Sequence, residues 1–214
     1  MTDLEFYETP APFTRYLFKS LAIDGDLYEP CAGNGAIVNA AVVGAGGARR
    51  WRTNDLDPRW PADTHHDART WWPGNDIIDW TVSNPPFSQA LDIITPALAA
   101  SVKGVAMHLR ISIHEVLKEG PRRTWFSKHP PTGILFLPRF AYQRSKKTGI
   151  WTQDSACACW VIWMDAVVPQ FIRYAPTWVL DELQQETAPY RTRMDALMGY
   201  TGSEQQRREQ RRGA

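Results

Sequence analysis

Strand-like and helix-like segments alternate along most of this chain, and this alternation limits its fold more than any other feature. Strands are predicted near residue 27 and over 50–54, 77–82, 103–109, 133–137 and 155–164. Helices are predicted over 10–23, 36–45, 88–100 and 114–127. The alternation predicts an α/β fold with a doubly wound, mostly parallel sheet. No helix is predicted between the last two strands, so we expect them to form an antiparallel hairpin at one edge.

The sequence Asn84-Pro85-Pro86-Phe87 follows the strand expected over 77–82. Proline fixes φ and keeps the preceding residue out of the helical region, so two prolines hold a short extended turn. Such a turn can present the Asn84 side-chain oxygen and the Pro85 carbonyl as two fixed acceptors, with the Phe87 ring beside them. A planar –NH2 group, with two donors and a π face, complements this arrangement. The alternative interpretation is an ordinary polar corner at a strand end.

A possible ligand-binding turn lies earlier, in Glu29-Pro30-Cys31-Ala32-Gly33-Asn34-Gly35. Glycines at such a turn admit positive φ and let a ligand approach the backbone. The helix that follows supplies unpaired N–H donors. The third glycine of the dinucleotide fingerprint is missing. Glu29, four residues before the first glycine, would repel a pyrophosphate and favours a cationic or hydroxyl-rich ligand.

Three further acids follow the turn at intervals along the chain. Asp55 lies about 20 residues beyond the glycines, at a strand end, which suits the binding of ribose hydroxyls. Asp57 precedes Pro58 and is predicted to begin a turn. Asp67 falls where another strand-end loop could meet a purine edge. Each acid alone suits a solvated loop, but their order and spacing favour one ligand site at the carboxyl ends of the strands.

These motifs resemble motifs I to IV of the class I S-adenosylmethionine-dependent methyltransferases. The Asn-Pro-Pro-Phe form is similar to that of the adenine-N6 DNA methyltransferases, and Phe6-Tyr7-Glu8-Thr9-Pro10 resembles motif X of that branch, placed first as in the gamma motif order. Segments 105–112, 135–140 and 154–160 are similar to the last strands of small phage-type members. The resemblance covers about residues 5–165 and implies a Rossmann-like, seven-stranded sheet.

The resemblance implies direct methyl transfer from S-adenosylmethionine to the N6 amino group of a flipped-out adenine in DNA, in restriction-modification or phage DNA modification. The implied catalytic residues are Asn84, Pro85, Pro86 and Phe87. The implied cofactor contacts are Tyr7, Thr9, Pro10, Glu29, Pro30, Cys31, Gly33, Asn34, Gly35, Asp55, Leu56 and Asp67. Thr9 and Pro10 are also a plausible helix start, with Thr9 as the N-cap.

Basic and aromatic residues are interleaved over 139–151, between the last two predicted strands. Basic groups can neutralise phosphates while aromatic rings stack on bases. A solvated hairpin is the alternative, and a second basic segment over 118–129 could flank the same cleft. The candidate nucleic-acid contacts are Arg110, Arg139, Phe140, Arg144, Lys146 and Lys147.

The length of 214 residues suits one α/β domain with small additions. We expect a methyltransferase domain over 1–170, a helical extension over 171–202 and a disordered, polar, basic tail over 203–214. This leaves little room for a target-recognition domain, so we expect a short or relaxed target sequence or a partner that supplies specificity. The net charge of +1 gives no global basic field, so nucleic acid must bind at local patches.

No long apolar run resembles a membrane span, and the acidic start is not a signal peptide, so we expect a cytoplasmic protein of a bacterium or a phage-infected cell. Three cysteines cannot form a disulfide framework, no metal site is predicted, and His108 is predicted to be structural. The alternatives are an RNA adenine-N6 methyltransferase, a protein glutamine-N5 methyltransferase, and a noncatalytic partner that binds S-adenosylmethionine or nucleic acid.

Overall fold

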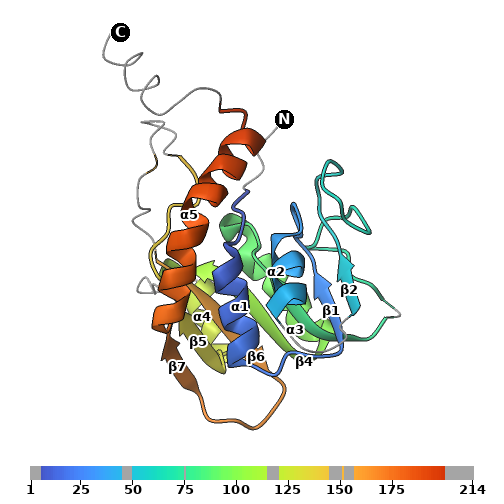
Figure 1. Ribbon diagram of the computed structural model, residues 1–214. Helices are drawn as coiled ribbons and strands as arrows, with labels where there is room; N and C mark the ends of the chain where they lie inside the picture. Colours follow the sequence, from blue (N-terminus) through green and yellow to red (C-terminus); the bar gives the residue numbers. More distant parts are fainter. Residues whose placement is uncertain are drawn as a thin grey trace.

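In the computed structural model, the described residues are 6–44, 50–74, 76–114, 121–144, 151 and 157–200. They form one seven-stranded sheet with helices on both faces (Figure 1). The strands, in chain order, are β1 (Asp26–Glu29), β2 (Arg50–Thr53), β3 (Ile78–Ser83), β4 (Ser101–Arg110), β5 (Gly133–Phe136), β6 (Ala158–Met164) and β7 (Phe171–Tyr174). Their order across the sheet is β2-β1-β3-β4-β6-β5-β7.

The first four strands in this order are parallel, and β6 is antiparallel to both of its neighbours, β4 and β5. The predicted α/β class and the predicted antiparallel pairing of the last two expected strands are confirmed. The strand β7 was not predicted. It pairs in parallel with β5 and forms the outer edge of the sheet.

Two layers of helices cover the sheet. The helices α1 (Ala11–Ser20), α2 (Ala36–Gly44) and α5 (Thr177–Leu197) pack on one face, and Figure 1 shows α5 running beside α1. The helices α3 (Ala90–Ala100) and α4 (Pro121–Lys128) pack on the other. Two single-turn 3-10 helices, η1 (Phe87–Gln89) and η2 (Ile111–His114), follow β3 and β4.

The central strands are buried on both faces, as expected for strands between two helical layers. Successive side chains of β4 alternate: Met107 and Leu109 join the cluster under α3, while Ala106 joins the cluster under α1 and α5. On β6, Trp160 is fully buried and its indole Nε1 donates to the Phe13 carbonyl of α1 at 2.9 Å. Burying each large apolar side chain stabilises the fold by roughly 1.5–3 kcal/mol.

Thr9 does not cap α1, so this prediction is wrong. The N-cap position is Pro10, and it makes no side-chain cap hydrogen bond. The Thr9 hydroxyl instead accepts a hydrogen bond from the Asn84 amide at 3.0 Å. The group that sequence rules assign to a helix end therefore supports a strand end 75 residues further along the chain.

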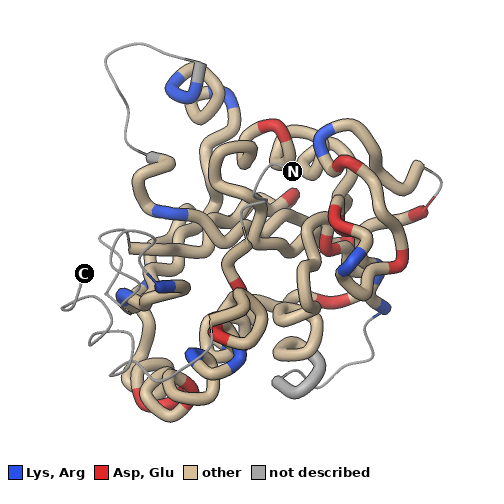
Figure 2. Tube along the Cα trace, turned by 90° about the horizontal axis from the view of Figure 1, so that it is seen from above, with Lys and Arg blue, Asp and Glu red and all other residues tan. Residues whose placement is uncertain are grey.

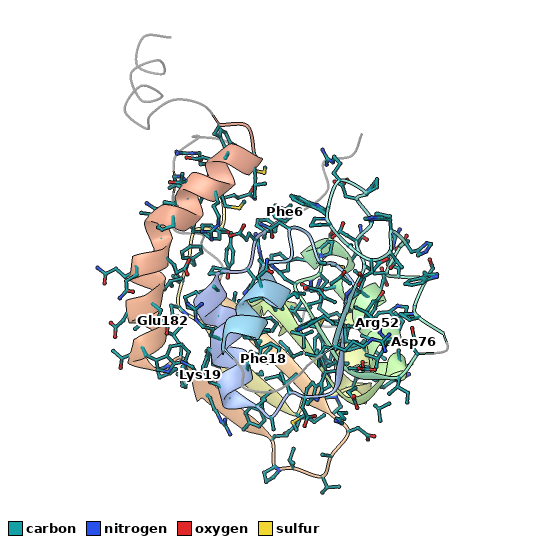
Figure 3. All side chains as sticks on the ribbon, turned by 45° about the vertical axis from the view of Figure 1, so that its right-hand side comes forward. Phe6, Phe18, Lys19, Arg52, Asp76 and Glu182 are labelled. Atoms are coloured by element: carbon teal, nitrogen blue, oxygen red, sulfur yellow. The ribbon has the colours of Figure 1, made fainter. Side chains whose placement is uncertain are left out.

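The segment 171–202, predicted to be a helical extension, contains both β7 and α5. Arg15 of α1 pairs with Glu182 of α5 at 2.7 Å, which holds the two helices together. Figure 3 shows Glu182 and Arg52 on opposite sides of the molecule, with Arg52 beside Asp76, its ion-pair partner at 2.5 Å. The predicted tail over 203–214 lies outside the described residues. No helix in the described ranges is both long and apolar enough to cross a membrane.

The hydroxyl of Tyr190 joins α5 to the N-terminal segment. Tyr190 is 1% exposed, and its hydroxyl donates to the carbonyls of Glu8 at 2.9 Å and Tyr142 at 3.0 Å. We expect Tyr190→Phe to lower the free energy of unfolding by about 1–3 kcal/mol, because buried acceptors lose their donor. Urea denaturation measures this loss. The control Tyr174→Phe alters an exposed ring, and an equal loss in both variants would contradict the assignment.

Candidate active site

The carboxyl ends of the parallel strands meet at one edge of the sheet and bring the predicted site residues together. Glu29 ends β1, Asp55 follows β2, Asn84 follows β3 and Arg110 ends β4. Ligands of doubly wound sheets bind at this edge, next to the strand where the order of connections reverses. That strand is β1 here, because β2 and β3 pair on either side of it.

The turn after β1 adopts a conformation that requires glycine at two positions. Gly33 has φ +53° and Gly35 has φ +77°, in the left-handed region that other residues rarely adopt. A Cβ atom at Gly33 would lie 2.7 Å from the Phe6 ring. Phe6 in turn stacks on Trp60, with ring centroids 4.7 Å apart. Figure 3 labels Phe6 above α1 and α2, in the upper part of the main body of the molecule.

Asp55 supports this turn directly. Its Oδ2 accepts the Gly33 amide at 2.7 Å, and its Oδ1 accepts the Asp57 amide at 2.9 Å. Burial raises the pKa of the Asp55 carboxyl, while these two hydrogen bonds oppose the increase. Each carboxylate oxygen has a second lone pair, so Asp55 can still accept bonds from ligand hydroxyls. Leu56 beside it is 49% exposed and offers an apolar surface.

Asp57 and Asp67 occupy two similar turns. Asp57 accepts the Arg59 amide at 3.0 Å, which confirms that it begins a turn. Asp67 accepts the Arg69 amide at 3.0 Å and forms an ion pair with the Arg69 guanidinium at 2.5 Å. This side-chain bond is the main reason why the pKa of Asp67 falls to about 2. A ligand edge would therefore meet an ionised carboxylate that Arg69 already engages.

Glu29 is the buried acid of the site. It is 1% exposed, and its Oε2 has no hydrogen-bond partner within the part of the chain that the structure describes. Burial, reinforced by the neighbouring Asp55, raises the pKa of the Glu29 carboxyl well above its usual range. A buried carboxyl oxygen without a partner, next to a glycine turn, fits a ligand that brings a donor or a positive charge. Burial also raises the pKa of Cys31.

Glu8 links the glycine turn to α5. Its side chain is almost fully buried, with Oε2 accepting from the Asn34 amide at 2.5 Å and Oε1 accepting from the Arg193 guanidinium at 2.9 Å. Asn34, which the resemblance assigns to the cofactor, thus has its side-chain nitrogen directed at Glu8. Glu8 has no role among the sequence-based predictions, although it lies within the 6–10 segment that resembles motif X.

The Asn84 side chain is held by three groups. Its Nδ2 donates to the Tyr7 carbonyl at 2.7 Å and to the Thr9 hydroxyl at 3.0 Å. Its Oδ1 faces Nδ1 of His108 at 3.2 Å. Because the Tyr7 carbonyl can only accept, the amide nitrogen must point to the N-terminal segment, and the oxygen has a defined direction.

An aromatic pair and a cation lie beside Asn84. Phe87 and Tyr7 stack with ring centroids 5.5 Å apart, and both rings are partly exposed. The Arg110 guanidinium lies 5.0 Å from the Phe87 centroid and 5.7 Å from that of Tyr7, within the range of cation–π attraction. Tyr7, expected on the cofactor side, therefore contributes its ring to the Phe87 side. Pro85 is buried and Pro86 is half-buried.

Two of the predicted nucleic-acid contacts are in the interior instead. Phe140 is 6% exposed and packs edge-on against Phe13 and Tyr190, so it does not fit the expected role of stacking on a base. Arg144 is 5% exposed and forms a two-point ion pair with Asp195 of α5, at 2.5 and 2.6 Å. Its charge is thus neutralised within the fold and does not fit a phosphate contact.

Three predicted nucleic-acid contacts remain, which are Arg139, Lys146 and Lys147. Arg139 is exposed and follows the end of β5. Lys146 and Lys147 lie outside the described residues. Across those ranges that are described, no group of three or more His, Cys, Asp or Glu residues is arranged to hold a metal ion.

The buried state of Glu29 gives a pH-dependent prediction. When folding raises the pKa of a carboxyl, the free energy of unfolding falls as the pH rises above the pKa of that group in the unfolded chain. The reason is that the group ionises freely in the unfolded chain and not in the folded chain. We expect Glu29→Gln to raise the free energy of unfolding by about 1–3 kcal/mol more at pH 8 than at pH 5. Urea denaturation at both pH values measures this. An equal effect at the two pH values would show that Glu29 ionises normally.

No protein-family model and no curated protein sequence matches this chain. Among solved structures, it resembles the methyltransferase subunit of a type I restriction-modification system from Streptococcus thermophilus, with a TM-score of 0.56 and 12% identity over 86% of this chain. This chain spans 53% of that subunit.

A second similar structure is a putative class I S-adenosylmethionine-dependent methyltransferase from Listeria monocytogenes, also with a TM-score of 0.56 and 12% identity. The match covers 88% of this chain and 74% of the Listeria protein. At this identity the likeness shows the fold alone. The chain has the Rossmann-like fold of the class I S-adenosylmethionine-dependent methyltransferases.

Proposed function

We propose that this protein is a methyltransferase that acts on the N6 amino group of adenine in DNA, with S-adenosylmethionine as methyl donor. The observation that carries the proposal is the fixed direction of the Asn84 amide oxygen. Tyr7 and Thr9 occupy both amide hydrogens, so the oxygen acts as an acceptor whose position does not depend on substrate. The stacked rings of Phe87 and Tyr7 beside it suit a planar base.

The chemistry of an aromatic amine explains why such an acceptor helps. The lone pair of the amine is delocalised into the ring, so the nitrogen is a weak nucleophile. Hydrogen bonds from its N–H groups to Asn84 Oδ1 and the Pro85 carbonyl would favour a pyramidal nitrogen and aim its lone pair. They would also stabilise the positive charge that develops on nitrogen. No covalent nucleophile on the protein is required.

S-adenosylmethionine, when bound, supplies a methyl group activated by a sulfonium. We assign its binding to Glu29, Gly33, Gly35, Asp55, Leu56 and Asp67, with the turn residues Pro30 and Cys31. Glu29 offers a cationic group a buried oxygen, Oε2, that has no partner among the described residues, and Asp55 offers lone pairs to hydroxyls. Thr9, Pro10 and Asn34 act indirectly in this proposal, because Thr9 and Asn34 already bind Asn84 and Glu8.

Nucleic acid is proposed to approach from the side of β4 and α4. In Figure 2, seen from above, most acidic residues gather over the half of the molecule that holds β1 and β2. Phosphates are repelled there and are better accommodated on the other half. Exposed basic residues on that half include Arg122, Arg123 and Lys128 of α4, and Arg139 after β5.

In this proposal, a duplex target must have its adenine flipped out, at a cost of a few kcal/mol that stacking in the pocket offsets. Phe87 and Tyr7 supply the stacking surface, and Arg110 stands beside them. The cytoplasm of a bacterium or a phage-infected cell would supply both DNA and the methyl donor.

Gly33 allows a matched test of the cofactor assignment. We expect Gly33→Ala to weaken the binding of S-adenosylmethionine at least about tenfold, because a side chain at positive φ costs roughly 1–3 kcal/mol and its Cβ displaces Phe6. Gly74→Ala is the control, since nothing lies within 4 Å of a Cβ there. Isothermal titration calorimetry measures both affinities. Equal affinities in the two variants would place the cofactor elsewhere.

The substrate is tested by nucleoside mass spectrometry. Purified protein and S-adenosylmethionine are incubated separately with unmethylated DNA and unmethylated RNA, and Asn84→Ala serves as the blank. We expect N6-methyldeoxyadenosine in DNA only. The variant should lose at least about 100-fold in rate, because a charge-stabilising acceptor is removed, while its cofactor affinity stays within a few-fold.

Three results would contradict the proposal. Methyladenosine confined to RNA would preserve the chemistry and favour an RNA substrate. No methylated base in either nucleic acid would favour a protein target or a noncatalytic role. Full activity in Asn84→Ala would exclude the mechanism. Because Asn84 also holds Tyr7 and Thr9, thermal denaturation of the variant is measured alongside.

A further inference from the structure

A chain of polar groups runs from the active-site rim into the core. Asn84 Oδ1 lies 3.2 Å from His108 Nδ1, and His108 Nε2 lies 3.1 Å from the Tyr142 hydroxyl. His108 is fully buried on β4, on the face that packs against α1. Phe13 and Trp160 pack against its ring, which therefore has a fixed place between Asn84 and Tyr142.

The partners of Asn84 determine which nitrogen of His108 carries the proton. The Asn84 nitrogen donates to Tyr7 and Thr9, so the atom that faces His108 is the oxygen, which can only accept. His108 Nδ1 must therefore be protonated. Burial lowers the pKa of His108 to about 3, so the ring is neutral and Nε2 is an acceptor. The Tyr142 hydroxyl then donates to Nε2.

We infer that His108 is a positioning residue for methyl transfer: its Nδ1–H binds one lone pair of Asn84 Oδ1 and leaves the other lone pair directed at the substrate amine. This inference rests on the proposed function. Tyr142 donates to His108 Nε2 and so supports the tautomer that Asn84 Oδ1 requires. His108 completes the set of three bonds that hold Asn84 before substrate arrives. Preorganised acceptors stabilise developing charge without reorganisation during the reaction.

The orientation of the amide explains why this third bond matters. The two hydrogen bonds that the Asn84 nitrogen donates prevent the amide from flipping. The amide can still rotate about its axis when the 6–9 segment shifts slightly. A donor on the oxygen side adds a fixed point on β4, a strand of the central sheet. Small displacements of a reacting group reduce rates strongly, so a second anchor contributes to turnover more than to binding.

The first test does not depend on activity. The full chain is labelled with 15N, and proton–nitrogen correlation spectra of its five histidines are recorded at pH 7. The His108→Gln variant identifies the His108 signals by their loss. The inference predicts a neutral ring with the proton on Nδ1. A proton on Nε2, or on both nitrogens, would overturn it.

The second test compares two substitutions that each retain one half of the imidazole. His108→Asn keeps a donor near the position of Nδ1, whereas His108→Gln extends toward the position of Nε2 and Tyr142. We expect kcat to stay within about threefold of wild type for His108→Asn and to fall roughly 10–100-fold for His108→Gln. Cofactor affinity and melting temperature should be similar in the two variants.

Equal losses of kcat in both variants, or no loss in His108→Gln, would overturn the positioning role. Failure of the proposed function is a separate outcome, because it would show as a wild-type protein that methylates neither DNA nor RNA. In that case the spectra of the wild-type protein still decide whether His108 donates to Asn84. If both variants fail to fold, single substitutions of His65, His66, His114 and His129 identify the other four signals, and the remaining signal in the wild-type spectra tests the inference.

Discussion

The extended segment from Phe6 to Thr9 is the element on which the two halves of the site depend. The buried carboxylate of Glu8 binds Asn34 in the glycine turn and Arg193 on α5. The flanking Tyr7 carbonyl and Thr9 hydroxyl bind the Asn84 amide. A carboxylate that is buried and accepts from two partners is costly to disturb, because losing a partner would leave buried charge uncompensated. Four consecutive residues therefore set the distance between the proposed cofactor site and the proposed acceptor of the amine.

This arrangement gives α5 a supporting role at the proposed active site. The α5 residues Tyr190 and Arg193 both bind Glu8, one through its backbone and one through its side chain. Asp195 neutralises Arg144 on the segment after β5. Through these contacts α5 holds Glu8 and the segment after β5 in place. Packed neighbours of this kind fix the rotamers of the groups that are proposed to act on substrate.

The parts of the structure that sequence patterns predicted are those that depend on local signals. The alternation of strands and helices, the glycine turn and the Asn-Pro-Pro-Phe corner each depend only on neighbouring residues. The four groups at the strand ends, which are Glu29, Asp55, Asn84 and Arg110, lie at one edge of the sheet. The residues whose surroundings differ from the expectation depend on partners far along the chain. Arg144 is neutralised by Asp195, Thr9 binds Asn84, and Phe140 packs on Tyr190 of a helix whose position no local pattern specifies. His108 was expected to be structural, and its tautomer follows only from the bonds that Asn84 makes elsewhere.

The central claim is that Asn84 Oδ1 accepts a hydrogen bond from the adenine amine. A crystal structure with S-adenosylhomocysteine and a DNA oligonucleotide that contains the mapped target tests it most directly. We expect the adenine N6 to lie within about 3 Å of Asn84 Oδ1, with the base against Phe87 and the Asn84 nitrogen still bound to Tyr7 and Thr9. An adenine bound away from Asn84, or an Asn84 oxygen that contacts only protein, would contradict it.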